Sequence, residues 1–178
     1  MAGESKSSGV WKWLRIVAIG RRPGWTVVRL LVLVGGAAVL FGYVLLPIRV
    51  SGISMEPTYH DGSVNFINRL AYSGGRQPAR GEVVAIRMAG RHVLLLKRVV
   101  GLPGERLAFR GGVVWINGAP VDEPYLKLPH NWMMRERTLG PDEYYFVGDN
   151  RSMDLELHEH GSTTADQILG RVVLAGNR

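Results

Sequence analysis

The sequence predicts a mainly β domain, built as a sandwich or a partly closed barrel, behind one N-terminal transmembrane helix. Two observations predict this fold. One long apolar run without charges, from Leu30 to Ile48, lies near the N-terminus. The rest of the chain consists of short runs rich in Val, Ile and Leu, separated by glycine-containing turns and with little helical periodicity. The 178 residues are enough for one modest core, so we expect a single folded domain outside the membrane.

The apolar run has the length of a membrane span. As a helix it would extend over roughly 28 Å, close to the roughly 30 Å hydrocarbon core of a bilayer. A cleaved signal peptide is the alternative, but its apolar region would be shorter and a small-x-small cleavage site would follow. The sequence PIRVSG at 47–52 offers no such site. We therefore expect a retained single span, assigned to residues 26–48.

Basic residues are concentrated before the apolar run Leu30–Ile48. The formal net charge is +7, and six basic residues stand before position 30 against Glu4 alone. They are Lys6, Lys12, Arg15, Arg21, Arg22 and Arg29. By the positive-inside rule, residues 1–25 are expected to be a cytoplasmic and partly interfacial segment of a cell-membrane protein, with residues 49–178 outside the cytoplasm. Because the basicity belongs to this segment rather than to the β domain, we expect the partner to be the lipid bilayer and not nucleic acid.

The strands of the outer domain are expected at regular intervals. They are assigned to residues 63–68, 82–88, 92–100, 143–148 and 170–175, with a hairpin strand at 113–116 between Gly111-Gly112 and Asn117-Gly118. Residues 163–169, TTADQIL, are the one helical candidate, with Thr163 or Thr164 as its cap. Residues 122–142 show no clean period and are interpreted as a long loop. Nothing in the sequence indicates an oligomeric state.

The composition narrows the possible chemistry. The chain has no cysteine, which excludes disulfides, thiolate metal sites and a cysteine nucleophile. The histidines are scattered, and none accompanies a G-x-S-x-G nucleophile elbow. His158 and His160 stand two residues apart without further ligands nearby, which is weak support for a metal site. We therefore expect neither a metal nor a cofactor.

A serine and a lysine are the best candidates for catalysis. Ser54 lies in SGISMEPTYHDG, where Pro57 stiffens the turn. Lys97 lies in the middle of the apolar run HVLLLKRVV, next to Arg98. A lysine buried without a counter-ion has a lowered pKa and can accept a proton, whereas arginine stays protonated. A serine hydroxyl becomes a strong nucleophile only beside such a base. The alternatives are that Lys97 reaches solvent from an edge strand and that Ser54 is a turn residue.

Four segments resemble one protein family. SGISMEPT resembles the serine box of the type I signal peptidase (leader peptidase) family, and LLLKRVVGLPGE resembles its lysine box. VWINGAPVDEPY is similar to the hairpin that follows, and YYFVGDNR to the G-D-N-R box. The order of the boxes matches, and the resemblance covers roughly residues 30–175. It implies a signal-peptidase-like β fold and a membrane-bound serine endopeptidase that removes N-terminal signal peptides from exported preproteins.

The resemblance also assigns site residues. It implies that Ser54 is the nucleophile and Lys97 the general base, with the backbone N–H of Ser54 in the oxyanion hole. Gly52 stands where some family members carry a second hydroxyl for that hole. Ile53 and Met55 flank the nucleophile and are expected to help shape the substrate site.

The segment after G-D-N-R departs from the family pattern. Many members continue with Ser-x-Asp-Ser-Arg, whereas this chain has Asp154, Glu156 and His158 at the corresponding serine, aspartate and arginine positions. We expect Asp154 to point away from Lys97, since a carboxylate in contact would raise the lysine pKa. Ser152 is then the expected orienting hydroxyl.

The family's buried Asp-Arg pair would be replaced by Glu156 and His158 or by nothing. Asp149 is expected to bond amides of its turn. Two other functions stay open from the sequence. One is maturation of a dedicated pilin or conjugation substrate. The other is a catalytically silent, membrane-tethered β module that binds partners.

Overall fold

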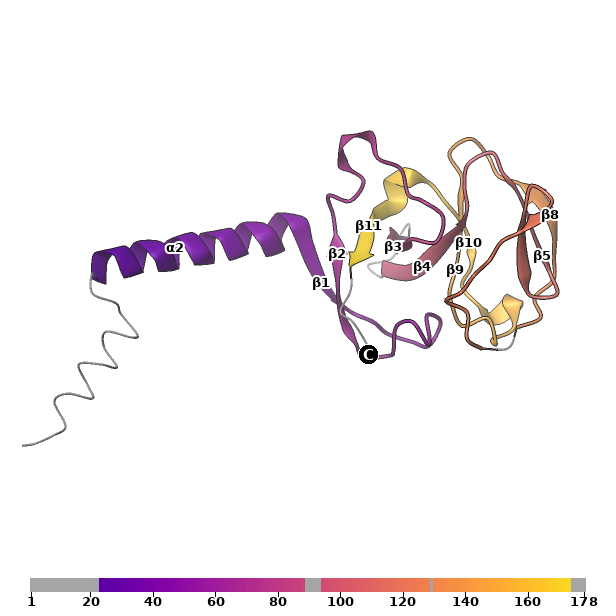
Figure 1. Ribbon diagram of the computed structural model, residues 1–178, viewed down its shortest axis with the longest axis horizontal. Coiled ribbons are helices and arrows are strands. Elements are labelled where there is room, and N and C mark those ends of the chain that lie inside the picture. Colours follow the sequence, from indigo (N-terminus) through magenta and orange to yellow (C-terminus); the bar gives the residue numbers. More distant parts are fainter. Residues whose placement is uncertain (1–22, 89–93, 129, 174–178) are drawn as a thin grey trace, which may run out of the picture. The chain divides into compact units, whose positions relative to one another are not determined.

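The computed structural model describes residues 23–88, 94–128 and 130–173 (Figure 1). The chain divides into a unit of residues 1–42 and a unit of residues 43–178. The predicted basic segment before residue 23, the first two residues of the strand expected at 92–100 and the end of the last strand expected at 174–175 lie outside the described residues.

The apolar run near the N-terminus forms a helix. Helix α2 spans Pro23–Val39 and continues into the π-helical segment η1, Leu40–Val44. Proline suits the first position of a helix because its missing N–H would have no helical partner there. The helical stretch Gly24–Val44 is long and apolar enough to cross a membrane. The predicted N-terminal apolar helix is confirmed.

The helix ends before the expected boundary at Ile48. Residues Leu45–Arg49 instead form strand β1, which pairs antiparallel with β2, Val64–Asn68. Pro47 explains the change, since its ring would clash inside a helix and it lacks the N–H for a helical hydrogen bond. Pro47 is tolerated in β1 because this strand lies at the edge of its sheet. The last part of the apolar run therefore belongs to the β domain.

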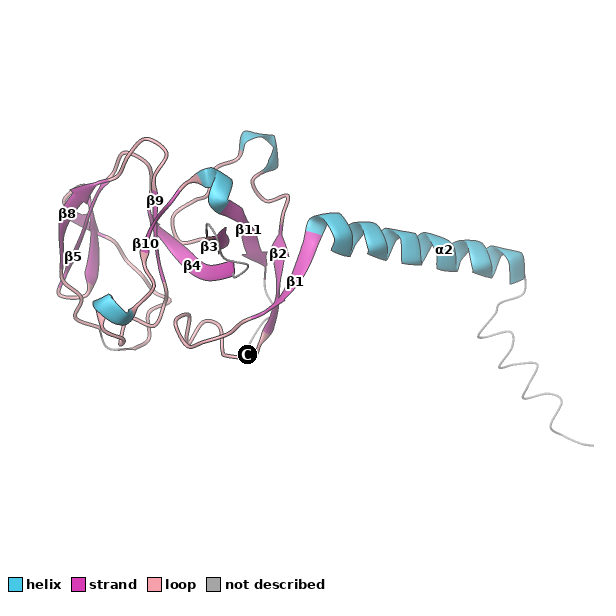
Figure 2. Ribbon diagram, turned by 180° about the vertical axis from the view of Figure 1, so that it is seen from behind, coloured by secondary structure: helices cyan, strands magenta, loops and turns pink. Residues whose placement is uncertain are grey.

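Two antiparallel sheets form the second unit (Figure 2). The remaining strands are β3 (Val83–Arg87), β4 (Leu94–Gly101), β5 (Arg106–Arg110), β6 (Val113–Ile116), β7 (Ala119–Pro120), β8 (Met134–Thr138), β9 (Tyr144–Val147), β10 (Gly161–Thr163) and β11 (Ile168–Val173). The larger sheet has the order β1-β2-β11-β3-β4-β9-β10, and the smaller sheet has the order β7-β6-β5-β8. The predicted mainly β fold is thus confirmed, and β4 is an interior strand.

Buried apolar side chains join these elements. One cluster brings Leu107 and Phe109 of the smaller sheet together with Val100 and Val147 of the larger one, so it closes the space between the two sheets. A second cluster places Met55, from the loop after β1, on strands β2, β3 and β11. The loop that carries Ser54 is therefore packed onto the larger sheet.

Two elements differ from the sequence prediction. Strand β8, Met134–Thr138, lies inside the segment expected to be a loop and pairs with β5. Its sequence MRERT shows no apolar alternation because most of its residues are exposed, so periodicity could not reveal it. The expected helix at 163–169 is only the short 3₁₀ turn η4, Ala165–Gln167, after which Ile168 begins β11. Thr164 does stand at the start of this turn, and its N–H donates to Gln167 Oε1.

Candidate active site

The loop between β1 and β2 carries Ser54. Gly52 has φ = +92°, a left-handed conformation that favours glycine, and its N–H donates to Asp61 Oδ1 at 2.8 Å. A Cβ at position 52 would meet no atom of the described residues within 4 Å. The glycine is therefore required by the backbone conformation and not by close approach of another segment. Ile53 is half exposed, whereas Met55 is buried in the core beneath the loop.

The segment after β9 fixes the backbone of Ser54. Asn150 donates its N–H to the carbonyl of Ser54 at 3.0 Å and its Nδ2 to the carbonyl of Ile53 at 3.0 Å. A Cβ at Gly148 would lie 2.1 Å from the Ser54 carbonyl oxygen, so only glycine allows this approach. The G-D-N segment thus holds the serine loop against the end of β9. The G-D-N-R box was visible in the sequence, but this supporting role of Asn150 and Gly148 was not.

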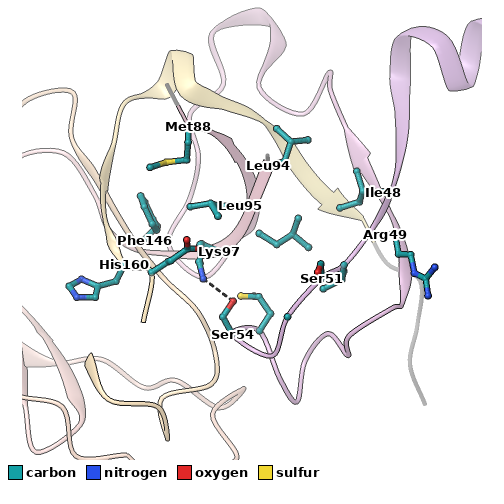
Figure 3. A pocket seen from close by; sticks show the side chains of 15 residues that line it. Ile48, Arg49, Ser51, Ser54, Met88, Leu94, Leu95, Lys97, Phe146 and His160 are labelled. Atoms are coloured by element: carbon teal, nitrogen blue, oxygen red, sulfur yellow. Dashed lines mark hydrogen bonds between the residues drawn. The ribbon is translucent and has the colours of Figure 1, made fainter. Parts of the chain in front are cut away.

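Lys97 is brought to Ser54 by strand β4. Its Cα pairs with Val84 of β3, and its side chain is 1% exposed. Nζ donates a hydrogen bond to Ser54 Oγ at 2.8 Å (Figure 3). The alternative in which Lys97 reaches solvent from an edge strand is wrong, since β4 is interior and the side chain is buried.

Burial sets the protonation of Lys97. Removal from water lowers the pKa of Lys97 to about 8, although the negative charges of Glu159 and Asp149 oppose the shift. A neutral amine is thus available at mildly alkaline pH, within hydrogen-bonding distance of a serine hydroxyl. This arrangement can transfer the hydroxyl proton to Nζ and generate a nucleophilic oxygen.

The neighbouring cation, Arg98, is paired instead. Its Nε donates to Asp149 Oδ1 at 2.8 Å, and its guanidinium lies 3.7 Å from the centre of the Tyr125 ring. Thr58 also donates its hydroxyl to Asp149, at 2.5 Å. The expectation that Asp149 bonds turn amides is therefore corrected, because its carboxylate accepts from Arg98 and Thr58. Since Asp149 is occupied by Arg98, Lys97 has no carboxylate within ion-pair distance among the described residues.

Ser152 and Asp154 do not reach Lys97. Ser152 is exposed, and its hydroxyl donates to Asn150 Oδ1 at 2.6 Å. The expectation that Ser152 orients the lysine is therefore not supported by its position. Asp154 is exposed, as is Glu156. In the part of the chain that the structure describes, Ser54 is the hydrogen-bond partner of the Lys97 amine.

His158 occupies a buried position that the sequence did not explain. Its ring packs edge-on against Trp132 with the centroids 4.9 Å apart, and its Nε2 has no hydrogen-bond partner among the residues that the structure describes. A Cβ at Gly148 would also lie 2.5 Å from the Cε1 atom of this ring, so His158 lies directly behind the contact between Gly148 and Ser54. Burial, followed by the positive charge of Lys97, lowers the pKa of His158 to about 4.

The expected pair of Glu156 and His158 is not formed. Glu156 is exposed, whereas His158 is buried. Arg151 forms a second buried ion pair instead, with Glu123 at 2.8 Å. Neither Glu123 nor Trp132 was singled out from the sequence, because both lie in the segment interpreted as a loop.

Ser54 and Lys97, called the dyad below, line a cleft of about 750 Å³. Apolar side chains form much of its lining: Ile48, Val50, Met55, Met88, Leu94, Leu95, Leu96 and Phe146. Gly52 and Ser51 also line it, while Ile53 does not. Among the described residues, no group of three or more His, Asp or Glu side chains is placed to hold a metal ion. The cleft therefore offers a reactive serine beside an apolar surface.

Comparison with known proteins shows the family. The family model "Signal peptidase, peptidase S26" matches residues 24–175. This chain belongs to the signal peptidase family. It is 31% identical to signal peptidase I of Bacillus caldolyticus over 167 residues, which cover 86% of this chain and 88% of that protein. It is 29% identical to signal peptidase IB of Staphylococcus aureus (strain Mu50) over 149 residues, covering 73% and 76%.

A solved structure was also matched. The crystal structure of a signal peptidase I from Enterococcus faecalis V583 aligns with a TM-score of 0.44 at 22% identity, covering 55% of this chain and 97% of that one.

The ion pair between Arg98 and Asp149 predicts a stability effect. Asp149→Ala should lower the free energy of unfolding by about 3–5 kcal/mol, because it leaves the arginine charge buried and unpaired. Chemical denaturation of the detergent-solubilised full chain measures this. The control is Glu136→Ala, which removes a partially exposed carboxylate 3.5 Å from Arg106 and should cost less than about 1 kcal/mol. Equal losses in the two variants would contradict the assignment.

The lowered pKa of His158 predicts that the folded protein is less stable at acidic pH. Its pKa is about 4 in the folded protein against 6.5 unfolded, so unfolding takes up a proton between these values and stability falls as pH drops from 6.5 to 4. The predicted loss is up to about 3 kcal/mol. Denaturation curves at several pH values should show a shallower decline in His158→Gln than in the parent. His60→Gln, at an exposed histidine, should follow the parent. Parallel curves for His158→Gln and the parent would refute this role.

Proposed function

We propose that Ser54 and Lys97 are the catalytic dyad with which this signal peptidase I removes signal peptides. The enzyme is a serine peptidase by its family, S26. The observation that supports this assignment is the 2.8 Å hydrogen bond between a buried lysine amine and Ser54 Oγ at the wall of the apolar cleft. No other serine of the described residues is hydrogen-bonded to a lysine.

The reaction follows from this geometry. Neutral Lys97 takes the hydroxyl proton as Ser54 Oγ attacks the carbonyl carbon of the scissile peptide bond. The protonated lysine then gives its proton to the leaving amine, so the mature protein departs and an ester links Ser54 to the signal peptide. Lys97, neutral again, takes a proton from a water molecule that attacks this ester. As the ester C–O bond breaks, Lys97 returns this proton to Ser54 Oγ, so the products are a free serine, a neutral lysine and a signal peptide with a new carboxyl group.

Backbone amides near Ser54 determine where the oxyanion can be stabilised. The N–H of Gly52 is already bonded to Asp61, and glycine offers no hydroxyl. In the described part of the chain, the N–H of Ser54 has no acceptor in the protein. We therefore assign this N–H as an oxyanion donor, in agreement with the role implied by the sequence resemblance.

The substrate is proposed to bind as an extended segment in the cleft. Strands β1 and β4 both contribute apolar side chains, Ile48 from the first and Leu94 and Leu96 from the second. An extended peptide can pair with a strand edge while its side chains enter pockets. Small residues before the bond are expected, as in the small-x-small sites of exported preproteins. The positioned dyad disfavours the catalytically silent alternative, and nothing in the cleft favours a dedicated pilin or conjugation substrate.

The membrane arrangement is proposed from the helix and the charges. The helix Gly24–Val44 is consistent with the membrane anchor of a signal peptidase I. The six basic residues that precede position 30 favour a cytoplasmic N-terminus and a catalytic domain outside the cytoplasm. This orientation places the dyad on the side where exported preproteins emerge.

The dyad predicts a set of activity losses. Ser54→Ala should abolish cleavage of a signal-peptide precursor, with kcat reduced by at least about 10³-fold. Lys97→Arg should be equally inactive, because arginine stays protonated at working pH. The double variant should be no worse than either single one. In the parent, kcat/KM should rise with pH through an apparent pKa of about 8, as Lys97 loses its proton. Cleavage by the solubilised enzyme over a pH series measures all of these.

Ser152→Ala is the matched control. It removes an exposed hydroxyl that bonds Asn150 and does not contact Lys97, so cleavage should remain close to that of the parent. Normal cleavage by Lys97→Arg would exclude the dyad. Loss of cleavage in folded Ser152→Ala would restore that serine as the residue that orients the lysine.

The orientation predicts which residues are accessible to an external protease. Protease added to spheroplasts should digest the domain from residue 49 onward and spare the N-terminal segment. Tags at the two ends, followed by immunoblotting, distinguish the fragments. Protection of the β domain in intact spheroplasts would show the opposite orientation.

A further inference from the structure

The two ends of the cleft differ in chemistry. Figure 3 shows Ile48, Ser51 and Leu94 on one side of the Ser54–Lys97 pair, and Phe146 and His160 on the other. Arg49 also lies on the side of Ile48, with its guanidinium at the outer margin of the view. Glu159 precedes His160 in the chain and lines the same cleft. A carboxylate is thus part of the wall that contains the nucleophile.

Within the described part of the chain, the Glu159 carboxylate forms no ion pair. Its side chain is exposed, and no cation of the described residues forms an ion pair with it. The acidic residues Glu82, Glu105, Glu123, Glu136, Glu143 and Asp149 are, in contrast, each paired with an arginine. An unpaired carboxylate in a substrate cleft is available to a charged group on the substrate.

The negative charge of Glu159 acts electrostatically on Lys97. Among the charged groups that act on Lys97, Glu159 has the largest effect and favours the protonated amine. Its field therefore extends to the place where the scissile bond must lie. A basic substrate side chain near this position would be attracted and an acidic one repelled, by an amount that salt reduces.

The apolar side chains of Ile48 and Leu94 indicate the direction in which the substrate chain runs through the cleft. The residues before the scissile bond of a signal peptide are small and apolar, so they belong beside Ile48 and Leu94. The chain after the bond must then continue past Ser54 toward Phe146, Glu159 and His160. This step rests on the proposed function.

We propose that Glu159 is a specificity-determining residue that favours a basic side chain, and disfavours an acidic one, in the first residues after the scissile bond. The ligand is thus a cationic start of the mature protein. This charge preference depends on the Glu159 carboxylate, which forms no ion pair within the described residues.

Three synthetic precursors test the proposal. They are identical except for the second residue after the scissile bond, which is Lys, Gln or Glu. For the parent enzyme we expect kcat/KM to fall in that order, by about 2- to 5-fold at each step, the size of an exposed charge pair. In Glu159→Gln the three values should converge, and in Glu159→Lys the order should reverse. Raising the salt to 0.5 M should shrink the parent's differences.

Glu156→Gln is the matched control. It removes an exposed carboxylate from the same segment that does not line the cleft, so the parent's order should persist. Each comparison is a ratio between peptides cleaved by one variant, so a change in stability or in the protonation of Lys97 cancels. An unchanged order in active Glu159→Gln would overturn the inference. Failure of the parent to cleave any precursor, or cleavage by Ser54→Ala, would instead refute the proposed function.

Discussion

The ion pair between Arg98 and Asp149 is the interaction on which the rest of the site depends. Arg98 follows Lys97 on β4, and Asp149 lies between Gly148 and Asn150, which contact the backbone of Ser54. One buried pair therefore connects the strand that carries the lysine to the segment that holds the serine. Because Asp149 bonds Arg98, it is also kept from pairing with Lys97. A lysine in a direct ion pair would stay protonated and could not act as a base.

The site also shows how two adjacent cations take different roles. Side chains at successive positions of a strand point to opposite faces, so Lys97 and Arg98 enter different surroundings. Arg98 meets a carboxylate and the ring of Tyr125, while Lys97 meets a serine hydroxyl inside an apolar wall. Burial raises the free energy of both charges, but only the arginine is compensated by a close ion pair. The difference between a structural cation and a titratable amine thus arises from one step along the strand.

The sequence was sufficient for the fold class, for most strands of the larger sheet and for the candidacy of Ser54 and Lys97, because these depend on apolar patterns and local motifs. It was insufficient where packing between distant segments determines the secondary structure or the partner of a side chain. Strand β8 exists because it pairs with β5, although MRERT has no strand pattern. Ser152 is favoured as the orienting residue because contact with the Asp154 carboxylate would raise the lysine pKa, yet the Ser152 hydroxyl bonds Asn150. The burial of His158 against Trp132 joins two segments that no local pattern connects.

The absence of a side chain at position 148 has a consequence for tool-making. The Ser54 carbonyl and the His158 ring both approach Gly148 more closely than any Cβ would permit. A methyl group there would displace the serine loop while leaving both reactive groups of the dyad chemically intact. A substitution at position 148 would therefore change the alignment of Ser54 and Lys97 without removing either catalytic group. An enzyme altered at this point would be a tool for measuring how much of the cleavage rate depends on alignment, because it keeps the serine hydroxyl and the lysine amine but not the 2.8 Å hydrogen bond between them.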